Sequence, residues 1–218
     1  MAKLEWDASG AHYYETGVKN GVLYVRKEDG TYPTGVAWNG LTAVTQSPSG
    51  AEATALYADD IKYLNLYSTE EFAATIEAYT YPDEFAECDG SYELAKGVSI
   101  GQQTRKSFGL VYKTVLGNDL RNNNHGYKIH IIYGAMAAPS EKAYATINDS
   151  PEAITFSWEL STTPVSVDGF SSTSYLEIDS TKVSAEKLAL LEAKLFGDES
   201  SEATLPLPND IKALMAEG

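Results

Sequence analysis

The chain has 218 residues, with 31 acidic and 16 basic side chains, so its formal net charge at pH 7 is −15. Hydrophobic residues make up 43% of the chain and charged residues 22%, a balance typical of a folded protein with a sizeable core rather than a disordered one. The strong negative charge disfavours binding to phosphate groups and to anionic membranes, because both would repel it.

Cysteine content and apolar runs narrow the class further. Cys88 is the single cysteine of the sequence, which excludes a scaffold held by intramolecular disulfides. The first residues lack the apolar core of a secretory signal, and no run approaches the ~18 apolar residues of a membrane span. We therefore expect a protein that is made in the cytosol and stays soluble there, with no membrane partner.

The first third of the chain predicts short strands separated by polar turns. Candidate strands cover residues 21–26, 35–44 and 61–67, where β-branched and aromatic residues lie between glycine-rich or polar segments. The polar stretch 45–54 is too long for a tight hairpin turn and has no apolar residues to pack it. We expect it to be an exposed loop, and loops of this kind are often functional.

Residues 68–81 fit two patterns. Ser68-Thr69-Glu70-Glu71 has the form of a helix-starting capping box, whereas residues 72–79 alternate with the strand period. We favour a strand, because threonine, isoleucine and tyrosine dominate the segment. A short helix is predicted over residues 82–88, with Pro82 in its first turn and Gly90 after its end.

The centre of the chain predicts three clear strands, at residues 108–115, 127–134 and 154–160. A turn-rich link, residues 117–126, joins the first two. The third strand alternates cleanly and therefore predicts one core face and one outer face. Its expected core residues are Ile154, Phe156, Trp158 and Leu160, and its expected outward residues are Thr155, Ser157 and Glu159.

The C-terminal region changes from strand to helix. After a short strand at 175–178, Ser184 precedes a predicted helix at 185–196, which carries a leucine stripe and stops at Gly197. A final short helix is predicted at 209–216. We expect one β domain, residues 1–180, followed by a C-terminal helix and an acidic, proline-containing tail, residues 181–218.

Charge is distributed unevenly along the chain. Residues 59–93 contain ten acidic side chains and one basic one, whereas residues 105–142 contain six basic and two acidic ones. One interpretation is two solvated faces of a single domain. The other is that an acidic edge of one subunit meets a basic edge of the next, which would steer assembly and fix its register. Composition alone does not choose between them.

The sequence contains no convincing catalytic, cofactor or metal motif. It has no phosphate-binding glycine loop and no nucleophile elbow. His125 and His130 are an odd spacing apart on or beside one strand, which directs them to opposite faces and makes a two-histidine metal site improbable. The acidic neighbours of Cys88 should raise its thiol pKa. We therefore expect a protein that is not an enzyme and that has no catalytic residues, no cofactor and no metal.

Several stretches become informative as an ordered set. They are Thr75–Phe85 (TIEAYTYPDEF) with Cys88-Asp89-Gly90, Gly101–Leu110 (GQQTRKSFGL), Gly126–Ala135 (GYKIHIIYGA), Pro139–Lys142 (PSEK), Asn148–Trp158 (NDSPEAITFSW), Thr162–Val165 (TTPV) and Leu205–Pro208 (LPLP). In this order they resemble the major tail protein, or tail tube protein, of long-tailed phages that infect Gram-positive bacteria. The resemblance runs from about Gly35 to the end of the chain, and no single stretch is diagnostic.

The resemblance implies a structural virion protein with a mainly β fold, a tail-tube-type β-sandwich or half-barrel with a flanking helix. Proteins of this family associate with themselves as hexameric rings, and the rings stack into a hollow tube around the tape measure protein. The tail terminator and distal tail proteins are then further partners. The genome passes through the tube without specific binding, and the tube is assembled in the bacterial cytoplasm and becomes part of the virion.

Three groups of candidate site residues follow from this implied role. An acidic inner wall would repel DNA and keep its path free, which makes Glu77 and Glu159 candidates for the lumen, although they fit an outer surface equally well. Basic side chains are candidates for contacts between subunits: Arg105, Lys106, Lys113 and Lys128. The family stacks its rings with a long loop, which makes the polar stretch the candidate for ring-to-ring contact: Gln46, Ser47, Pro48, Ser49, Gly50 and Glu52.

Two alternatives from other classes stay open at this point. A non-catalytic carbohydrate-binding β-sandwich could use exposed tyrosines and tryptophans as stacking platforms, and Trp158 on an expected core face argues against that role. A hydrolase is the third alternative, and it lacks any placed nucleophile or base.

Overall fold

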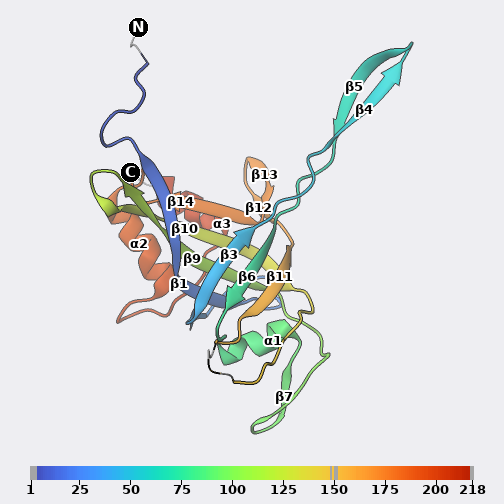
Figure 1. Cartoon of the computed structure of the whole chain (residues 1–218), viewed down its shortest axis with the longest axis vertical. Helices are drawn as coiled ribbons and strands as arrows, with labels where there is room; N and C mark the ends of the chain where they lie inside the picture. Colours follow the sequence, from blue (N-terminus) through green and yellow to red (C-terminus); the bar gives the residue numbers. More distant parts are fainter. Residues whose placement is uncertain (1–3, 148, 150–151, 217–218) are drawn as a thin grey trace.

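The chain forms a mainly β protein, seen in a computed structural model that describes residues 4–147, 149 and 152–216. A curved sheet makes the body of the molecule, and a long hairpin projects from one of its ends (Figure 1). The strands of the body, in their order across the sheet, are β2 (Gly35–Trp38), β1 (Tyr13–Val25), β9 (Phe108–Asn118), β10 (Asn122–Ala137), β11 (Phe156–Thr162), β6 (Ala73–Ala78) and β3 (Leu41–Gln46), with β14 (Tyr175–Asp179) also paired to β10.

The two ends of this strand order meet at one corner of the chain. β2 ends at Trp38 and β3 begins at Leu41, so the first and last strands of the sheet are separated by only Asn39 and Gly40. Gly40 has φ +77, a left-handed conformation that glycine adopts without steric cost. The sheet therefore curls back on itself into a half-barrel, as the resemblance implies.

Strand β10 passes from one side of the half-barrel to the other at Gly134. Residues 128–132 pair with β14, whereas residues 135–137 pair with β11. Gly134 has φ +58, and a Cβ at this position would lie 2.3 Å from the carbonyl oxygen of Thr163. Its N–H donates to the hydroxyl oxygen of Tyr32, 3.0 Å away. Only glycine fits this bend without displacing the backbone of its neighbour.

The inside of the half-barrel holds an aromatic core. Trp158 is fully buried, and its ring meets those of Trp38 and Phe85 at centroid distances of 6.0 and 5.0 Å. Its indole N–H donates to Asp89 Oδ1 at 3.1 Å, which satisfies the polar atom that burial would otherwise leave without a partner. The predicted core face of the third central strand is confirmed at Trp158 and Leu160, and Glu159 is exposed as predicted.

Helices cover the opposite face of the sheet. α2 (Ala185–Phe196) and α3 (Pro208–Ala216) pack against the outer side chains of β1, β9, β10 and β14. The predicted leucine stripe is confirmed, because Leu188, Leu191 and Leu195 are buried in one cluster with Ile129 and Ile131. Residues after 180 therefore share a hydrophobic core with the strands that precede them. Ser184 precedes the helix as predicted, although its side chain makes no capping hydrogen bond.

Most predicted elements are confirmed, and the differences have local causes. Residues 73–78 form a strand, and the short helix appears as a 3₁₀ turn, η1 (Asp83–Phe85), followed by α1 (Ala86–Asp89) with Gly90 in the left-handed conformation. The turn-rich link is shorter than predicted, because β9 extends to Asn118 and β10 begins at Asn122. Five strands were not predicted: β4 (Ala53–Ala58), β7 (Tyr92–Ala95), β8 (Val98–Ile100), β12 (Val165–Val167) and β13 (Phe170–Thr173).

Two observations concern the limits of the described chain. Asn148, Ser150 and Pro151, which belong to one of the stretches that carry the resemblance, lie outside the described residues. Within the residues that the structure does describe, no helix is both long enough and apolar enough to cross a membrane.

Candidate functional site

The most prominent feature of the surface is an arm, residues 47–72, that leaves the half-barrel between β3 and β6 (Figure 1). Its outer part is a hairpin of two antiparallel strands, β4 (Ala53–Ala58) and β5 (Ile61–Tyr67). Asp59 and Asp60 form the turn with φ of +51 and +61, and two successive positive φ values are typical of a tight two-residue hairpin turn. The predicted strand at 61–67 is confirmed, and it lies in this arm rather than in the core.

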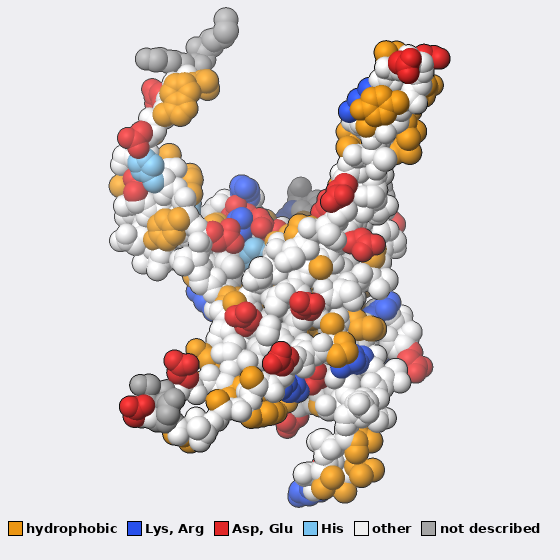
Figure 2. Space-filling model, turned by 45° about the vertical axis from the view of Figure 1, so that its right-hand side comes forward, with side chains coloured by type: hydrophobic (Ala, Val, Ile, Leu, Met, Phe, Trp, Pro, Cys, Tyr) orange, Lys and Arg blue, Asp and Glu red, His pale blue; other side chains and the backbone are white. Residues whose placement is uncertain are grey.

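Large apolar side chains of the arm are exposed to solvent, and Figure 2 shows them gathered around its outer half beside acidic tip residues. A monomeric soluble protein rarely exposes an apolar patch of this extent, and such patches mark interaction sites. The residues, with their exposed fractions, are Leu56 (40%), Tyr57 (71%), Ile61 (67%), Tyr63 (70%), Leu64 (38%), Leu66 (54%) and Tyr67 (69%).

The polar stretch that was predicted to be an exposed loop is one side of the neck of this arm. Ser49 and Glu71 exchange two backbone hydrogen bonds, of 2.9 and 2.8 Å, and the N–H of Ser47 donates to the carbonyl oxygen of Ala73 at 2.8 Å. Gly50 has φ +87, and a Cβ there would lie 2.2 Å from the carbonyl oxygen of Thr69. The stretch is exposed as predicted, and its residues 47–52 lie between β3 and β4, where backbone pairing with residues 68–73 makes them one side of the neck.

The ring-stacking candidates consequently lie at the root of the arm. Ser47, Pro48, Ser49, Gly50 and Glu52 are in the neck, and Gln46 is the last residue of β3. The contact surface was predicted in the polar segment, and the apolar hairpin beyond it was not predicted. The alternation of Ile61, Tyr63 and Tyr67 with polar or smaller residues was the available signal.

The lumen candidates Glu77 and Glu159 lie on the outer face of the sheet formed by β3, β6 and β11. Glu77 pairs with Ser157 and Glu159 pairs with Thr75, so the two acids are diagonal neighbours on one face. Both are exposed, and the other side chains of that face are short, including Ala43, Thr45 and Ser157. Their outward orientation is confirmed, and their position in a lumen stays a prediction.

The predicted inter-subunit lysines already have carboxylate partners within the chain. Lys106 pairs with Glu87, Lys113 with Glu192 at 2.5 Å, and Lys128 with both Glu15 and Glu177 at 2.9 Å. Arg105 packs over Gly90, and a Cβ on that glycine would lie 3.3 Å from the Arg105 guanidinium carbon. These lysines therefore form ion pairs within the subunit, and their role between subunits stays a prediction.

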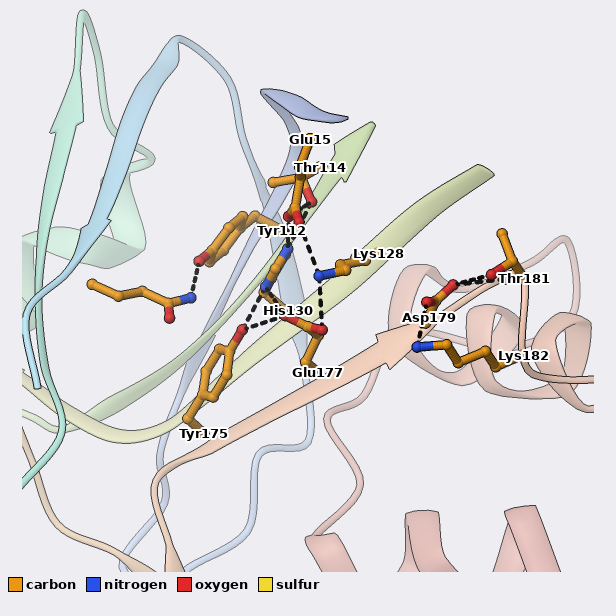
Figure 3. A network of polar contacts seen from close by, with 11 residues as sticks. Glu15, Tyr112, Thr114, Lys128, His130, Tyr175, Glu177, Asp179, Thr181 and Lys182 are labelled. Carbon is orange, nitrogen blue, oxygen red and sulfur yellow. Dashed lines mark hydrogen bonds and ion pairs between the residues drawn. The ribbon is translucent and has the colours of Figure 1, made fainter. Parts of the chain in front are cut away.

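A polar network lies beneath the arm, at the open end of the half-barrel, and His130 is at its centre (Figure 3). The His130 ring is buried and stacks on the Tyr112 ring, with a centroid distance of 4.7 Å. His130 Nε2 lies 2.7 Å from Thr114 Oγ1 and 3.3 Å from Glu15 Oε1. On the other side of the ring, Nδ1 lies 2.7 Å from the Tyr175 hydroxyl.

The two ends of the arm, at Gln46 and Phe72, both contact this network. Gln46, where the arm begins, donates from Nε2 to the Tyr112 hydroxyl at 2.9 Å. Phe72, where the arm returns, stacks on the Tyr175 ring with a centroid distance of 5.0 Å and an interplanar angle of 9°. Sequence reasoning treated His130 only as a poor metal ligand and missed this arrangement, because the side chains come from five strands, β1, β3, β9, β10 and β14, that only the folded sheet brings together.

The charges around the network set the protonation of its groups. Burial lowers the pKa of His130, opposed by the carboxylates of Glu15 and Glu177. Hydrogen bonds from Thr114 and Lys128 outweigh the partial burial of Glu15 and lower the pKa of its carboxyl. The lowered pKa keeps His130 neutral near pH 7, and its ring lies between the carboxyl groups of Glu15 and Glu177, which share Lys128.

The remaining candidates for chemistry do not assemble into a site. No group of three or more histidine, cysteine, aspartate or glutamate side chains is placed to hold a metal ion in the part of the chain that the structure describes. Cys88 is buried, and burial together with Glu87 raises the pKa of its thiol to about 12. Trp38 and Trp158 are buried in the core, so neither is a platform for a sugar, and Trp6 is 79% exposed in the N-terminal segment.

Comparison with known proteins gives little further guidance. No protein-family model matches the chain, and no curated protein matches it either. Among solved structures, a chain from the six-fold symmetrised cryo-EM structure of the anti-feeding prophage baseplate is similar, with 9% sequence identity and a TM-score of 0.39. The similarity covers 80% of this chain and 97% of that one. At this level it carries no conclusion about function.

Proposed function

We propose that this chain is a non-catalytic structural protein of a phage virion, which associates with itself into stacked, hexameric rings and so builds the tail tube. The ordered resemblance along the sequence supplies the family, and the exposed apolar arm is the single observation that carries the proposal. An arm that points away from its own subunit needs another molecule to cover its apolar side chains.

The energetics of the arm favour an occupant of substantial size. Burying one large apolar side chain contributes about 1.5–3 kcal/mol. Seven such side chains together represent on the order of 10 kcal/mol before the entropy cost of association is subtracted. A second copy of the chain is the natural occupant, because a surface that contacts a different surface of an identical subunit generates open, continuing polymers.

The charge of the sheet formed by β3, β6 and β11 fits a conduit for DNA. Glu77 and Glu159 stand on a face of short side chains, which presents negative charge without bulky obstacles. Such a face repels phosphate and lets a duplex pass without being held. In this role the partners are further copies of the chain, the tape measure protein inside the tube, and the tail terminator and distal tail proteins at its ends.

The arm provides the experiment. Ile61, Tyr63 and Tyr67 occupy alternate positions of β5 and are each about two-thirds exposed, so replacing all three with threonine removes apolar surface while retaining strand propensity. We expect a folded subunit that forms no tubes under conditions in which the unaltered chain forms them, as seen by electron microscopy.

A matched control removes three exposed apolar side chains from the body of the molecule: Leu120→Thr, Phe170→Thr and Leu190→Gln. This variant should assemble like the unaltered chain. Tubes of normal length and number from the arm variant would contradict the assigned role of the arm. Loss of tubes in both variants would also contradict it, because assembly would then depend on exposed apolar surface in general and not on the arm.

A further inference from the structure

A second hairpin projects from the molecule at the end opposite to the arm (Figure 1). It consists of β7 and β8, which pair with each other and with no other described strand. Its large apolar side chains are exposed: Leu94 (67%), Val98 (51%) and Ile100 (36%). A two-stranded hairpin without a packing partner is only marginally stable in water, so this hairpin gains stability when another surface covers its apolar side chains.

Hydrogen bonds fix the β7–β8 hairpin at its base and at its turn. At the base, the N–H of Gln103 donates to the carbonyl oxygen of Gly90 at 3.0 Å. At the turn, Gly97 has φ +78 and its N–H donates to Glu93 Oε1 at 3.0 Å. This bond engages Glu93, the one acidic residue between positions 91 and 100. The hairpin is therefore formed before any partner binds, which lowers the entropy cost of docking onto it.

Positive charge lies at both ends of the β7–β8 hairpin. Lys96 is exposed at its turn. Arg105 lies at its base, where the guanidinium packs over Gly90, the residue that ends α1. Neither cation forms an ion pair with a carboxylate of the described residues, and the buried Nε of Arg105 has no hydrogen-bond partner among them. Both charges are thus available to a second molecule.

The arm carries the opposite charge in the corresponding places. Its acids are exposed, and none pairs with a cation in the part of the chain that the structure describes. Figure 2 shows acidic side chains at the tip of the arm, a basic one at the tip of the lower projection, and apolar side chains behind both. The acids of the arm are Asp59 and Asp60 in its turn and Glu52, Glu70 and Glu71 in its neck, against one base, Lys62.

The spacing of these charges is similar in the two hairpins. Glu52 and Asp59 are seven residues apart along the arm, or about 23 Å at about 3.3 Å per strand residue. Ser91, which follows Gly90 at the base of the second hairpin, and Lys96 are five residues apart, or about 17 Å. Long charged side chains span the difference. Each hairpin therefore has an apolar middle between two charged ends, with opposite signs.

We propose that the β7–β8 hairpin is the docking site for the arm of a second copy of the chain, with the two hairpins side by side and pointing in opposite directions. In this arrangement the acidic turn of the arm meets Arg105 of the second copy, and the acids of the neck meet its Lys96. The apolar middles of the two hairpins cover each other. The inference rests on the proposed function in taking a second copy as the occupant of the arm.

The positions of the two hairpins make this contact directional. β6 begins where the arm ends and leads into η1 and α1, which precede β7, so the arm and its docking site lie at opposite ends of the subunit. A contact between two different surfaces continues from copy to copy and does not close into a symmetric pair. Pairing of two arms is disfavoured, because it would place acid against acid.

Two variants of the full chain test the docking site without requiring a tube. The arm variant (Ile61→Thr, Tyr63→Thr, Tyr67→Thr) keeps its β7–β8 hairpin, and a hairpin variant (Leu94→Thr, Val98→Thr, Ile100→Thr) keeps its arm. Sedimentation velocity compares each variant alone with their equimolar mixture. We expect the mixture to contain a species at least twice the mass of the particles that either variant forms alone, because only the mixture combines an intact arm with an intact docking site.

Charge exchange in the same mixture identifies the surfaces that meet. Lys96→Glu, added to the arm variant, should weaken the association about tenfold, because like charges then face each other. Glu52→Lys with Glu70→Lys, added to the hairpin variant, should restore it. Lys194→Glu, a change of an exposed base on α2, is the matched control and should leave the association unchanged.

The outcomes separate the docking site from the proposed function. A mixture with no heavier species, or an association that Lys96→Glu leaves unchanged, would overturn the docking site even if the unaltered chain forms tubes. A heavier species in the mixture, with no tubes from the unaltered chain, would support the docking site and contradict the tube. If circular dichroism shows that the hairpin variant does not fold, a chain with Lys96→Glu alone replaces it, and a mixture without the heavier species would again overturn the proposal.

Discussion

The indole Nε1 of Trp158 lies 3.1 Å from Oδ1 of Asp89, and this hydrogen bond connects a fully buried ring of the half-barrel to the end of α1. The second oxygen of this carboxylate accepts from Lys142 Nζ at 2.6 Å. Trp158 is fully buried and Asp89 is 8% exposed. One acidic side chain therefore satisfies a buried donor and anchors the segment after β10.

Replacing Asp89 with alanine should destabilise the fold by about 3 kcal/mol, because it leaves the buried Trp158 N–H without a partner and the partly exposed Lys142 ammonium without its carboxylate. Urea unfolding, with an unchanged dependence on denaturant, measures the loss. Asp89→Asn retains an acceptor oxygen for Trp158 and should cost less. Glu84→Ala, an exposed acid in the preceding turn, is the control and should change stability by less than about 0.5 kcal/mol. An Asp89→Ala loss as small as that of the control would contradict this account of the core.

Two glycines with positive φ separate conformational strain from steric clash. Gly17→Ala meets no atom within 4 Å, so it should cost only the left-handed conformation at φ +69, about 1 kcal/mol. Gly134→Ala brings a Cβ to 2.3 Å from a backbone oxygen and should cost several kcal/mol or prevent folding. Thermal or urea unfolding of the pair checks the difference. Equal losses of unfolding free energy would contradict the claim that Gly134 is required for the close approach of β10 to the Thr163 carbonyl oxygen.

The histidines should titrate on opposite sides of their ordinary value. A hydrogen bond to Asp7, then one to Asp119, raises the pKa of His12, whereas burial lowers that of His130. The His12 contacts therefore stabilise the fold at low pH and are lost as pH rises through the raised value. For His130 the sign is reversed, and stability falls as the pH drops below about 6.5. NMR titration of the ring protons resolves the two, and a His130 value above that of His12 would contradict the burial argument.

Charge reversal tests the acidic face. Under the proposed function, Glu77→Lys and Glu159→Lys should slow DNA ejection from assembled virions, because a positive wall holds phosphate. The slowing should weaken as the salt concentration rises. Glu199→Lys, an exposed acid in the segment after α2, is the control and should eject at the normal rate. Normal ejection from both lumen variants would place this face on the outside of the tube.

Elements whose buried face follows from the local spacing of hydrophobic residues could be predicted from the sequence. The leucine stripe of α2 and the alternation around Trp158 each report a single buried face, and both are found where the pattern places them. The left-handed Gly90 after α1 and the stop at Gly197 follow from the conformational freedom of glycine. Residue spacing and the conformational freedom of glycine are sufficient to predict these features.

The arm and the polar network around His130 depend on contacts that no local sequence pattern contains. The neck pairs Ser49 with Glu71, two polar residues whose sequence gives no strand signal, so the stretch was interpreted as a loop. Nothing in the sequence around His130 on β10 indicates its role, because its partners Tyr112 and Tyr175 come from β9 and β14. Likewise, the basic candidates appear free in the sequence, and Lys113 finds Glu192 only when α2 folds onto the sheet.

Electron microscopy of the purified, unaltered chain over a rising concentration series tests the central claim most directly. The account predicts hollow tubes or rings with six-fold symmetry, in which the apolar side chains of the arm are covered by a neighbouring copy. Light scattering should show the corresponding growth in mass with concentration. A chain that remains monomeric at millimolar concentration, with Tyr57 and Tyr63 of the arm still accessible to solvent, would contradict self-assembly through the arm.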